Sequence, residues 1–139
     1  MIYIVNDDIL KVMTQQELDQ VLDGHPSALD DAEETTLDMV RDYLSDLYDI
    51  EAEFIKTDTD RSGTLVAYMV DVLLYYICMR TAPDNVPEIR MHNKEQSLKW
   101  FLQVNSGKIK LSGVDKTIAE SGRPMRWGDT KTADNQLNY

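Results

Sequence analysis

A chain of 139 residues in which 42% of positions are hydrophobic is long enough for one domain with a core of its own. Its formal net charge of -11 at pH 7 makes it a poor general binder of nucleic acid, because phosphate groups repel it. The single cysteine, Cys78, excludes a disulfide framework within the chain and lies in an apolar run, so we expect it to be buried.

No targeting or membrane-spanning segment stands out. The first residues, MIYIVNDDIL, lack the basic region and the apolar stretch of a signal peptide. The longest apolar run, from Leu65 to Met79, is short for a bilayer and contains Asp71. We therefore expect a soluble, intracellular protein that makes no membrane contact.

The charge is divided unevenly along the chain. Residues 1–60 contain 17 acids and 3 bases, for a net charge of -14, whereas residues 61–139 contain 8 acids and 11 bases, for +3. Oppositely charged halves favour head-to-tail contact between copies, or contact with a differently charged partner. The alternative is an acidic face that is simply solvated.

The first predicted elements are short. Residues 2–5, IYIV, predict either a strand or an extended lead-in. Thr14 and Glu17 have the spacing of a capping box, which predicts a short helix that ends at Gly24.

A longer, one-sided helix is predicted to start at Pro26 and Ser27. Its apolar face follows three- and four-residue spacing and consists of Leu29, Ala32, Thr36, Leu37, Val40, Tyr43, Leu44 and Leu47. The opposite face is predicted to lie in water and consists of Asp31, Glu34, Asp38, Asp42, Ser45 and Asp49. Residues 49–63 then break the pattern and predict an extended link that lays Phe54 on the core.

The helix from about Thr64 to Arg80 is apolar all around, which predicts a central helix buried on most sides. Its one acid, Asp71, is expected to pair with a base or to lie at a subunit boundary, because an unpaired buried carboxylate is costly. Pro83 and Pro87 then bracket a rigid turn.

The last predicted helix runs from about Glu88 to Asn105 and stops at Gly107. Its apolar stripe is predicted to contain Leu98, Phe101, Leu102 and Asn105, with Trp100 and Val104 beside it. Together the elements predict an all-α fold, a compact bundle of about four helices in residues 1–111. An extended, irregular C-terminal arm is expected in residues 112–139.

The arm is too polar to offset its own ordering entropy, so we expect a neighbouring subunit or a partner to hold it. Arginine and tryptophan are common interface anchors. The candidate contact residues of the arm are Arg123, Met125, Arg126, Trp127 and Tyr139. The alternative is a loose end whose tryptophan folds back onto the domain.

One loop resembles half of a calcium site. Residues 58–64, DTDRSGT, place oxygen donors at EF-hand positions one, three and five and glycine at position six. Position twelve, which should be a bidentate glutamate, is Met69, and Arg61 adds a positive charge to the loop. The alternative is a turn that caps the following helix.

No catalytic or cofactor-binding pattern emerges, so neither an enzyme nor a bound cofactor is expected. His25, His92 and Cys78 do not have the spacing of a metal site. A further cluster of aromatic side chains could stack on bases, but its helical spacing in an apolar context favours core packing. These side chains are Tyr75, Tyr76, Trp100 and Phe101.

Several segments together resemble a family of small virion proteins of tailed phages, the Mu-like group related to head–tail connector (adaptor, or head-completion) proteins. The resemblance rests on DVLLYYICMR at residues 71–80, AP at 82–83, VPEIR at 86–90, and LKWFL at 98–102 with SGKI at 106–109. Residues 29–48 are similar to the family's first long helix, so the resemblance covers roughly residues 27–111. The chain departs from the family at His92 and Asn93, where an Arg-Tyr pair is usual, and the arm has no counterpart.

The resemblance implies a helical subunit of a ring, usually dodecameric, that docks on the portal in the virion neck. Such a ring extends the DNA channel and offers a surface to the stopper or tail-completion protein; double-stranded DNA passes through without sequence-specific binding. We add the hypothesis that the acidic face Asp31, Glu34, Asp38 and Asp42 lines the channel. The alternative function is a calcium-responsive binding module built on Asp58–Thr64.

Overall fold

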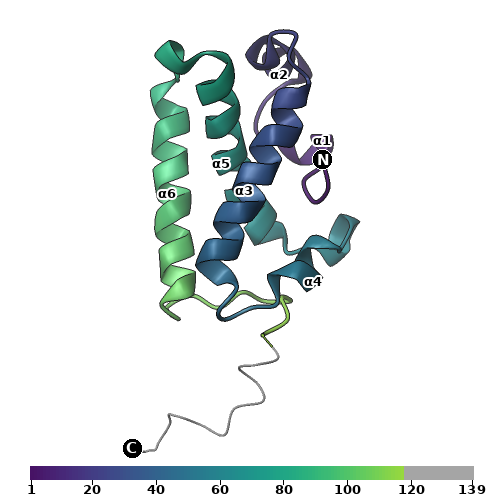
Figure 1. Ribbon diagram of the computed structural model, residues 1–139, viewed down its shortest axis with the longest axis vertical. Helices are drawn as coiled ribbons and strands as arrows, with labels where there is room; N and C mark the ends of the chain where they lie inside the picture. Colours follow the sequence, from purple (N-terminus) through teal and green to yellow (C-terminus); the bar gives the residue numbers. More distant parts are fainter. Residues whose placement is uncertain (118–139) are drawn as a thin grey trace, which may run out of the picture.

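The computed structural model describes residues 1–117, and within them the fold is all-α with no strands. Four main helices pack together: α2 (Gln15–Leu22), α3 (Ser27–Leu44), α5 (Gly63–Thr81) and α6 (Glu88–Asn105) (Figure 1). The shorter elements are α1 (Asn6–Ile9), α4 (Ile50–Phe54) and 3-10 turns at Asp58–Asp60 and Pro83–Asn85. The predicted fold class, an all-α bundle of about four helices, is confirmed.

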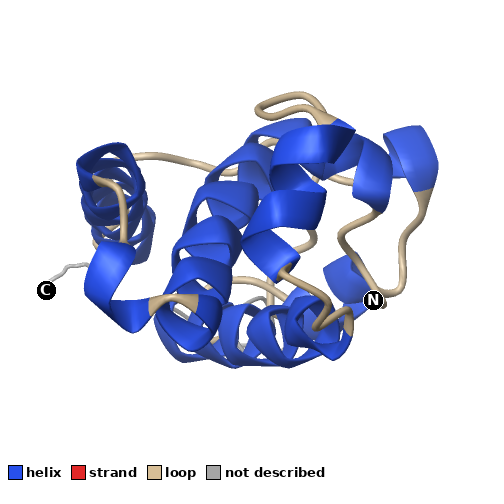
Figure 2. Ribbon diagram, turned by 90° about the horizontal axis from the view of Figure 1, so that it is seen from above, coloured by secondary structure: helices blue, strands red, loops and turns tan. Residues whose placement is uncertain are grey.

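Helix α5 is the centre of the bundle. Helices α3 and α6 pack along it, and α2 and α1 contact it as well. Seen from above, α6 lies at one side of the molecule and the N-terminus at the other (Figure 2). The buried residues of α5 are Leu65, Val66, Met69, Val70, Val72, Leu73, Leu74, Ile77 and Cys78. The prediction of a central apolar helix that contains a buried Cys78 is therefore confirmed.

By length and composition alone, α5 is the one helix in residues 1–117 that could cross a membrane, with 50% of that stretch buried in the bundle. The core helix of a bundle has the same length and composition, and α5 occupies that position here.

Helix α6 has the predicted bounds, but its buried face is rotated from the predicted stripe. The buried residues are Ser97, Trp100, Phe101 and Val104, whereas Leu102 is 55% exposed. Each residue turns about 100° around a helix, so Leu102 points away from the core that Phe101 enters. Two aromatic stacks join α6 to its neighbours, Tyr68 on Trp100 at 4.3 Å and Tyr43 on Phe101 at 5.9 Å between ring centroids.

The link at residues 49–63 is more ordered than predicted. Asp49 begins α4, because its carboxylate accepts a hydrogen bond from the backbone N–H of Ala52 at 3.2 Å. This role explains why Asp49 is half-buried rather than solvated as predicted. Phe54 lies in the core, as predicted.

The N-terminal residues form neither a strand nor an extended lead-in, because Tyr3 and Ile4 lie in a bend. The Glu33 carboxylate holds this bend, accepting hydrogen bonds from the backbone N–H groups of Ile2, Tyr3 and Ile4 at 2.6, 2.8 and 2.8 Å. Glu33 is 2% exposed. This N-terminal clamp holds Tyr3 and Ile4 in the core.

The described chain ends against the link between α3 and α4. After Gly107, which has a φ of 86° and ends α6 as predicted, the backbone N–H of Asp49 donates to Asp115 O at 2.7 Å. That of Thr117 donates to Leu47 O at 3.2 Å. The first residues of the predicted arm thus lie against the bundle, and the rest of the arm lies outside the described residues.

We predict that Glu33→Gln lowers the free energy of unfolding by about 1–3 kcal/mol, because an amide –NH₂ faces backbone N–H groups that need an acceptor. Urea unfolding followed by circular dichroism measures the change. The control is Glu34→Gln, on the exposed side of the same turn, for which we expect less than about 0.5 kcal/mol. Equal effects of the two substitutions would contradict the clamp.

Candidate functional site

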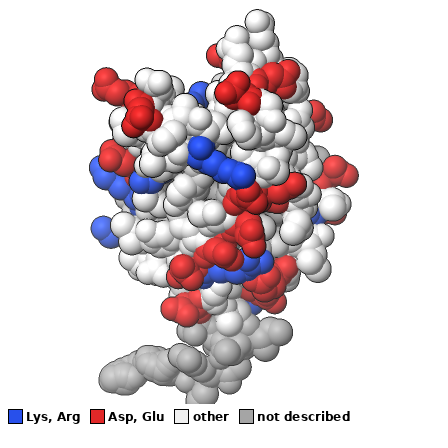
Figure 3. Space-filling model, turned by 45° about the horizontal axis from the view of Figure 1, so that its top comes forward, with Lys and Arg blue, Asp and Glu red and all other residues white. Residues whose placement is uncertain are grey.

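The acidic face of α3 is exposed at all four predicted positions, Asp31, Glu34, Asp38 and Asp42. Acidic side chains spread over this side of the molecule, as the red atoms of Figure 3 show. Two of the four acids have a basic partner: Asp31 pairs with Arg80, and Asp38 with Arg41.

Arg41 also joins α3 to α4. Its Nε donates to Glu51 at 2.6 Å and its guanidinium lies 5.2 Å from the centroid of the Phe54 ring. Arg41 therefore offsets part of the acidic charge, and within the described residues Glu34 and Asp42 are the two acids of the predicted face without an ion pair.

The charge of the bundle changes sign between two of its sides. Residues 27–60, which include α3 and α4, contain 12 acids and 2 bases, for a net charge of -10. Residues 88–111, which include α6, contain 2 acids and 5 bases, for +3. Because α6 lies at one side of the bundle and α4 at the other, each copy presents an acidic and a basic side.

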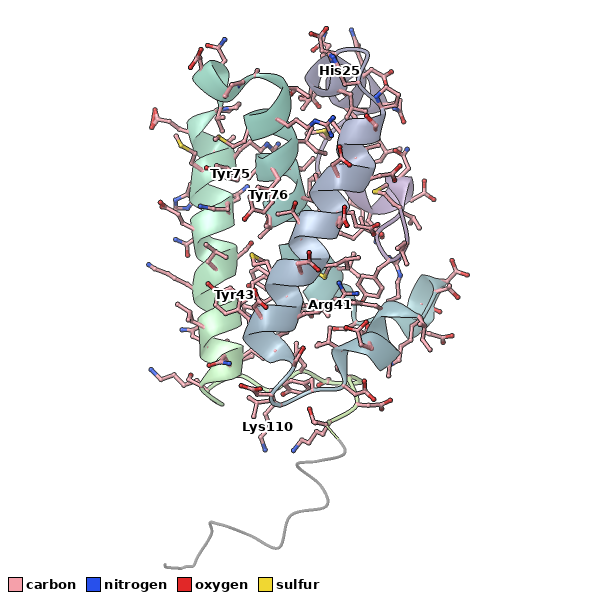
Figure 4. All side chains as sticks on the ribbon, viewed as in Figure 1. His25, Arg41, Tyr43, Tyr75, Tyr76 and Lys110 are labelled. Atoms are coloured by element: carbon pink, nitrogen blue, oxygen red, sulfur yellow. The ribbon has the colours of Figure 1, made fainter. Side chains whose placement is uncertain are left out.

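The aromatic cluster is only partly core. Trp100 and Phe101 are buried, as predicted, whereas Tyr75 and Tyr76 are half-buried. Figure 4 shows both tyrosines, with Tyr43, where α6 meets α3 and α5 (Figure 4). The Lys94 ammonium lies 4.5 Å from the centroid of the Tyr75 ring, so this edge of the cluster is covered by a cation.

The loop Asp58–Thr64 forms a helix-capping turn. Asp58–Asp60 is a 3-10 turn, and the hydroxyl of Ser62 accepts from the backbone N–H of Leu65 at 3.3 Å to begin α5. Arg61 turns inward, donating to the Asp8 carboxylate at 2.6 and 3.0 Å and to Tyr3 O at 3.0 Å.

Within residues 1–117, no three His, Cys, Asp or Glu side chains are grouped so that they could hold a metal ion. The capping alternative is confirmed, because Ser62 begins α5. His25 and His92 are exposed, the first in the turn between α2 and α3 and the second on α6.

Sequence reasoning missed a buried acidic network beneath this loop. Glu53 Oε2 accepts from the hydroxyl of Tyr3 at 2.5 Å and from the backbone N–H of Ser62 at 2.7 Å, and Glu53 Oε1 lies 3.0 Å from Lys56 Nζ. Burial and the neighbouring Glu53 carboxylate raise the pKa of Tyr3. The network ties the N-terminal segment, α4 and the start of α5 together.

A groove of about 680 Å³ lies between α1, the Asp58–Asp60 turn and α5. Asp71 was predicted either to pair with a basic side chain or to lie at a subunit boundary. It lines this groove and is half-buried. Burial raises the pKa of Asp71, which the charge of Arg90 partly offsets. Among residues 1–117 its carboxylate forms no ion pair or hydrogen bond, so the first alternative, direct pairing with a base, is not seen there.

The other predicted contact residues lie outside the described residues. These are Arg123, Met125, Arg126, Trp127 and Tyr139.

Comparisons with known proteins identify no family. No protein-family model matches the chain, and no solved structure matches it. The chain is similar to asparagine–tRNA ligase of Thermoplasma acidophilum (strain ATCC 25905), with 26% identity over 99 residues. That similarity covers 69% of this chain but 21% of the ligase, so the chain spans about a fifth of the length of this curated relative. A similarity of this extent does not place the chain in that enzyme family.

We predict that Asp8→Asn removes a pH-dependent part of the stability. Burial alone would raise the pKa of Asp8, but hydrogen bonds from Arg61 and Val5 and the charge of Arg61 together lower it below its ordinary value. The carboxylate therefore stabilises the fold fully above about pH 4–5, and this contribution is lost as the pH falls through the lowered pKa.

We expect Asp8→Asn to cost about 3 kcal/mol at pH 7, because it leaves the Arg61 charge without its partner. The difference in the free energy of unfolding between this variant and the wild type should become smaller below about pH 4. Urea unfolding at several pH values measures this difference. The control is Asp7→Asn, at an exposed position. A gap that stays constant from pH 7 to pH 3 would contradict the ion pair.

Proposed function

We propose that the chain is a structural, non-enzymatic subunit of the neck of a tailed phage. In this proposal copies form a ring, of twelve subunits as is usual for connectors of the family that the chain resembles. The ring docks on the portal, extends the DNA channel and offers a surface to the stopper or tail-completion protein. The subunit is located in the virion between capsid and tail, where double-stranded DNA passes through the ring without sequence-specific binding.

The proposal depends mainly on where the fold places the segments that resemble the phage connector family. Residues 71–80 form the second half of α5, residues 83–90 the proline turn and the start of α6, and residues 98–109 the rest of α6 and its stop. Residues 29–48 form most of α3, which packs on both helices. Segments that are separate in the sequence thus make up one three-helix core.

The division of charge supports assembly into a ring. A ring requires heterologous contact, in which one surface of a copy meets a different surface of the next. The acidic side around α4, with 6 acids and 1 base in residues 45–60, and the basic side with α6 are complementary in this way. The acidic face of α3 then stays free of this contact. Leu102 of α6, which is 55% exposed and lies between Lys94 and Lys99 around the helix, adds apolar area to this basic side.

We predict that a phage carrying an amber codon early in this gene produces DNA-filled heads and separate tails in a non-suppressing host. A plasmid copy of the wild-type gene should restore tailed particles. Electron microscopy of lysates and plaque counts measure both results. Normal tailed, infectious particles without the protein would overturn the proposed function.

We further infer that Glu34 and Asp42 line the channel. Their charges have no basic partner within the described residues, so they would repel DNA phosphates and keep the DNA from sticking. Asp31 and Asp38, which are paired, would contribute less to this repulsion.

We predict that the double substitution Glu34→Lys/Asp42→Lys slows DNA ejection several-fold, and more so at low salt, while particles still assemble. Ejection into solution, followed by the fluorescence of a DNA-binding dye, gives the rate. The control is Asp84→Lys, an exposed acid in the Pro83–Asn85 turn. Ejection at the wild-type rate from particles with both lysines would contradict the lining role.

A further inference from the structure

The groove beside α5 combines an apolar floor with an acidic rim. Val66, Ala67 and Val70 of α5 form its floor, and Val5 and Val12 lie at its edge, each 47% exposed. Its polar lining residues are Asp7, Asp8, Lys11, Asp58, Thr59, Arg61 and Asp71. The exposed valines leave apolar area in contact with water that an apolar ligand would cover.

The charge of the groove favours a basic ligand. Arg61 and Asp8 neutralise each other in their bidentate ion pair, so they add little net charge to the groove. The remaining acids are Asp7, Asp58 and Asp71, against the single base Lys11. Asp71 makes no ion pair among the described residues, and a half-buried carboxylate of this kind gains most from an arriving cation.

One segment of the chain outside the described residues has the complementary chemistry. Residues 123–127, Arg-Pro-Met-Arg-Trp, contain two arginines and no acid, with Met125 and Trp127 as apolar groups. Pro124 restrains the backbone, which lowers the entropy that docking costs. Arg126 and Trp127 are of the residue types that most often anchor interfaces.

We propose that residues 123–127 of one copy dock in the α5 groove of the next copy, with the arginines on Asp58 and Asp71 and the apolar side chains on the valines. This inference rests on the proposed ring function. Exchange of this segment between copies is an asymmetric contact that a closed ring can repeat.

The test is photo-crosslinking of the full chain with Trp127→p-benzoyl-phenylalanine. Equal amounts of ¹⁴N- and ¹⁵N-labelled protein are mixed at high concentration, irradiated, digested and analysed by mass spectrometry. We expect crosslinks between position 127 and peptides that contain residues 58–71, with light and heavy peptides joined as often as like with like. Crosslinks within one chain only, crosslinks to another surface, or no crosslink would each overturn the proposal.

Charge neutralisation provides the second arm. Asp58→Asn/Asp71→Asn should lower the yield of this crosslink several-fold, since it removes two acids from the groove with little change of shape. Asp46→Asn/Asp84→Asn removes the same charge from exposed sites outside the groove and should leave the yield unchanged. Equal yields from both variants would overturn the role of the acidic rim.

Complementation of the amber phage separates this inference from the proposed function. Tailed particles restored by a chain that shows no crosslink in the groove would refute the docking and leave the neck role in place. Normal tailed particles without the protein would refute the neck role itself, whatever the crosslinks show.

Discussion

The need to cover the apolar surface of α5 on most sides is the constraint on which the rest of the structure depends. Apolar residues occur all around this helix, and each that is fully buried contributes about 1.5–3 kcal/mol relative to exposure. Helices α3 and α6 cover much of its surface, and α1 and α2 also contact it. The bend before α1 has backbone N–H groups without a partner in a helix or strand, so buried Glu33 accepts their hydrogen bonds.

Helices with a strong apolar pattern could be predicted from the sequence. The predicted central helix Thr64–Arg80 is Gly63–Thr81, and Glu88–Asn105 has the predicted bounds, because Ser62, Pro87 and Gly107 mark their ends locally. The short helix α4 was missed since its five residues carry no period, and its cap, Asp49, looked like a solvated acid. Leu102 was misplaced because α6 has apolar residues on two faces.

The buried acids were harder to predict, because their partners are far away in the sequence. Glu33 binds residues 29 to 31 positions before it, and Glu53 binds Tyr3, 50 positions before it. One signal was present: Glu33 lies four residues after Leu29 and three before Thr36, so helical spacing places a charge on the buried face. The groove brings together α1 and α5, and only the folded chain places Asp7 near Asp71. The predicted acidic face, by contrast, follows from helical spacing alone and is exposed as expected.

The same packing leaves one acidic and one basic side on the outside of the bundle, which is the physical basis for proposing contact between copies in a phage neck. Cryo-electron microscopy of the intact virion, with the neck reconstructed under its own symmetry, tests this account most directly. It predicts a ring below the portal whose subunits fit α3, α5 and α6, with the acidic side around α4 of each copy against the basic side with α6 of the next. A neck in which no subunit fits this bundle would contradict it.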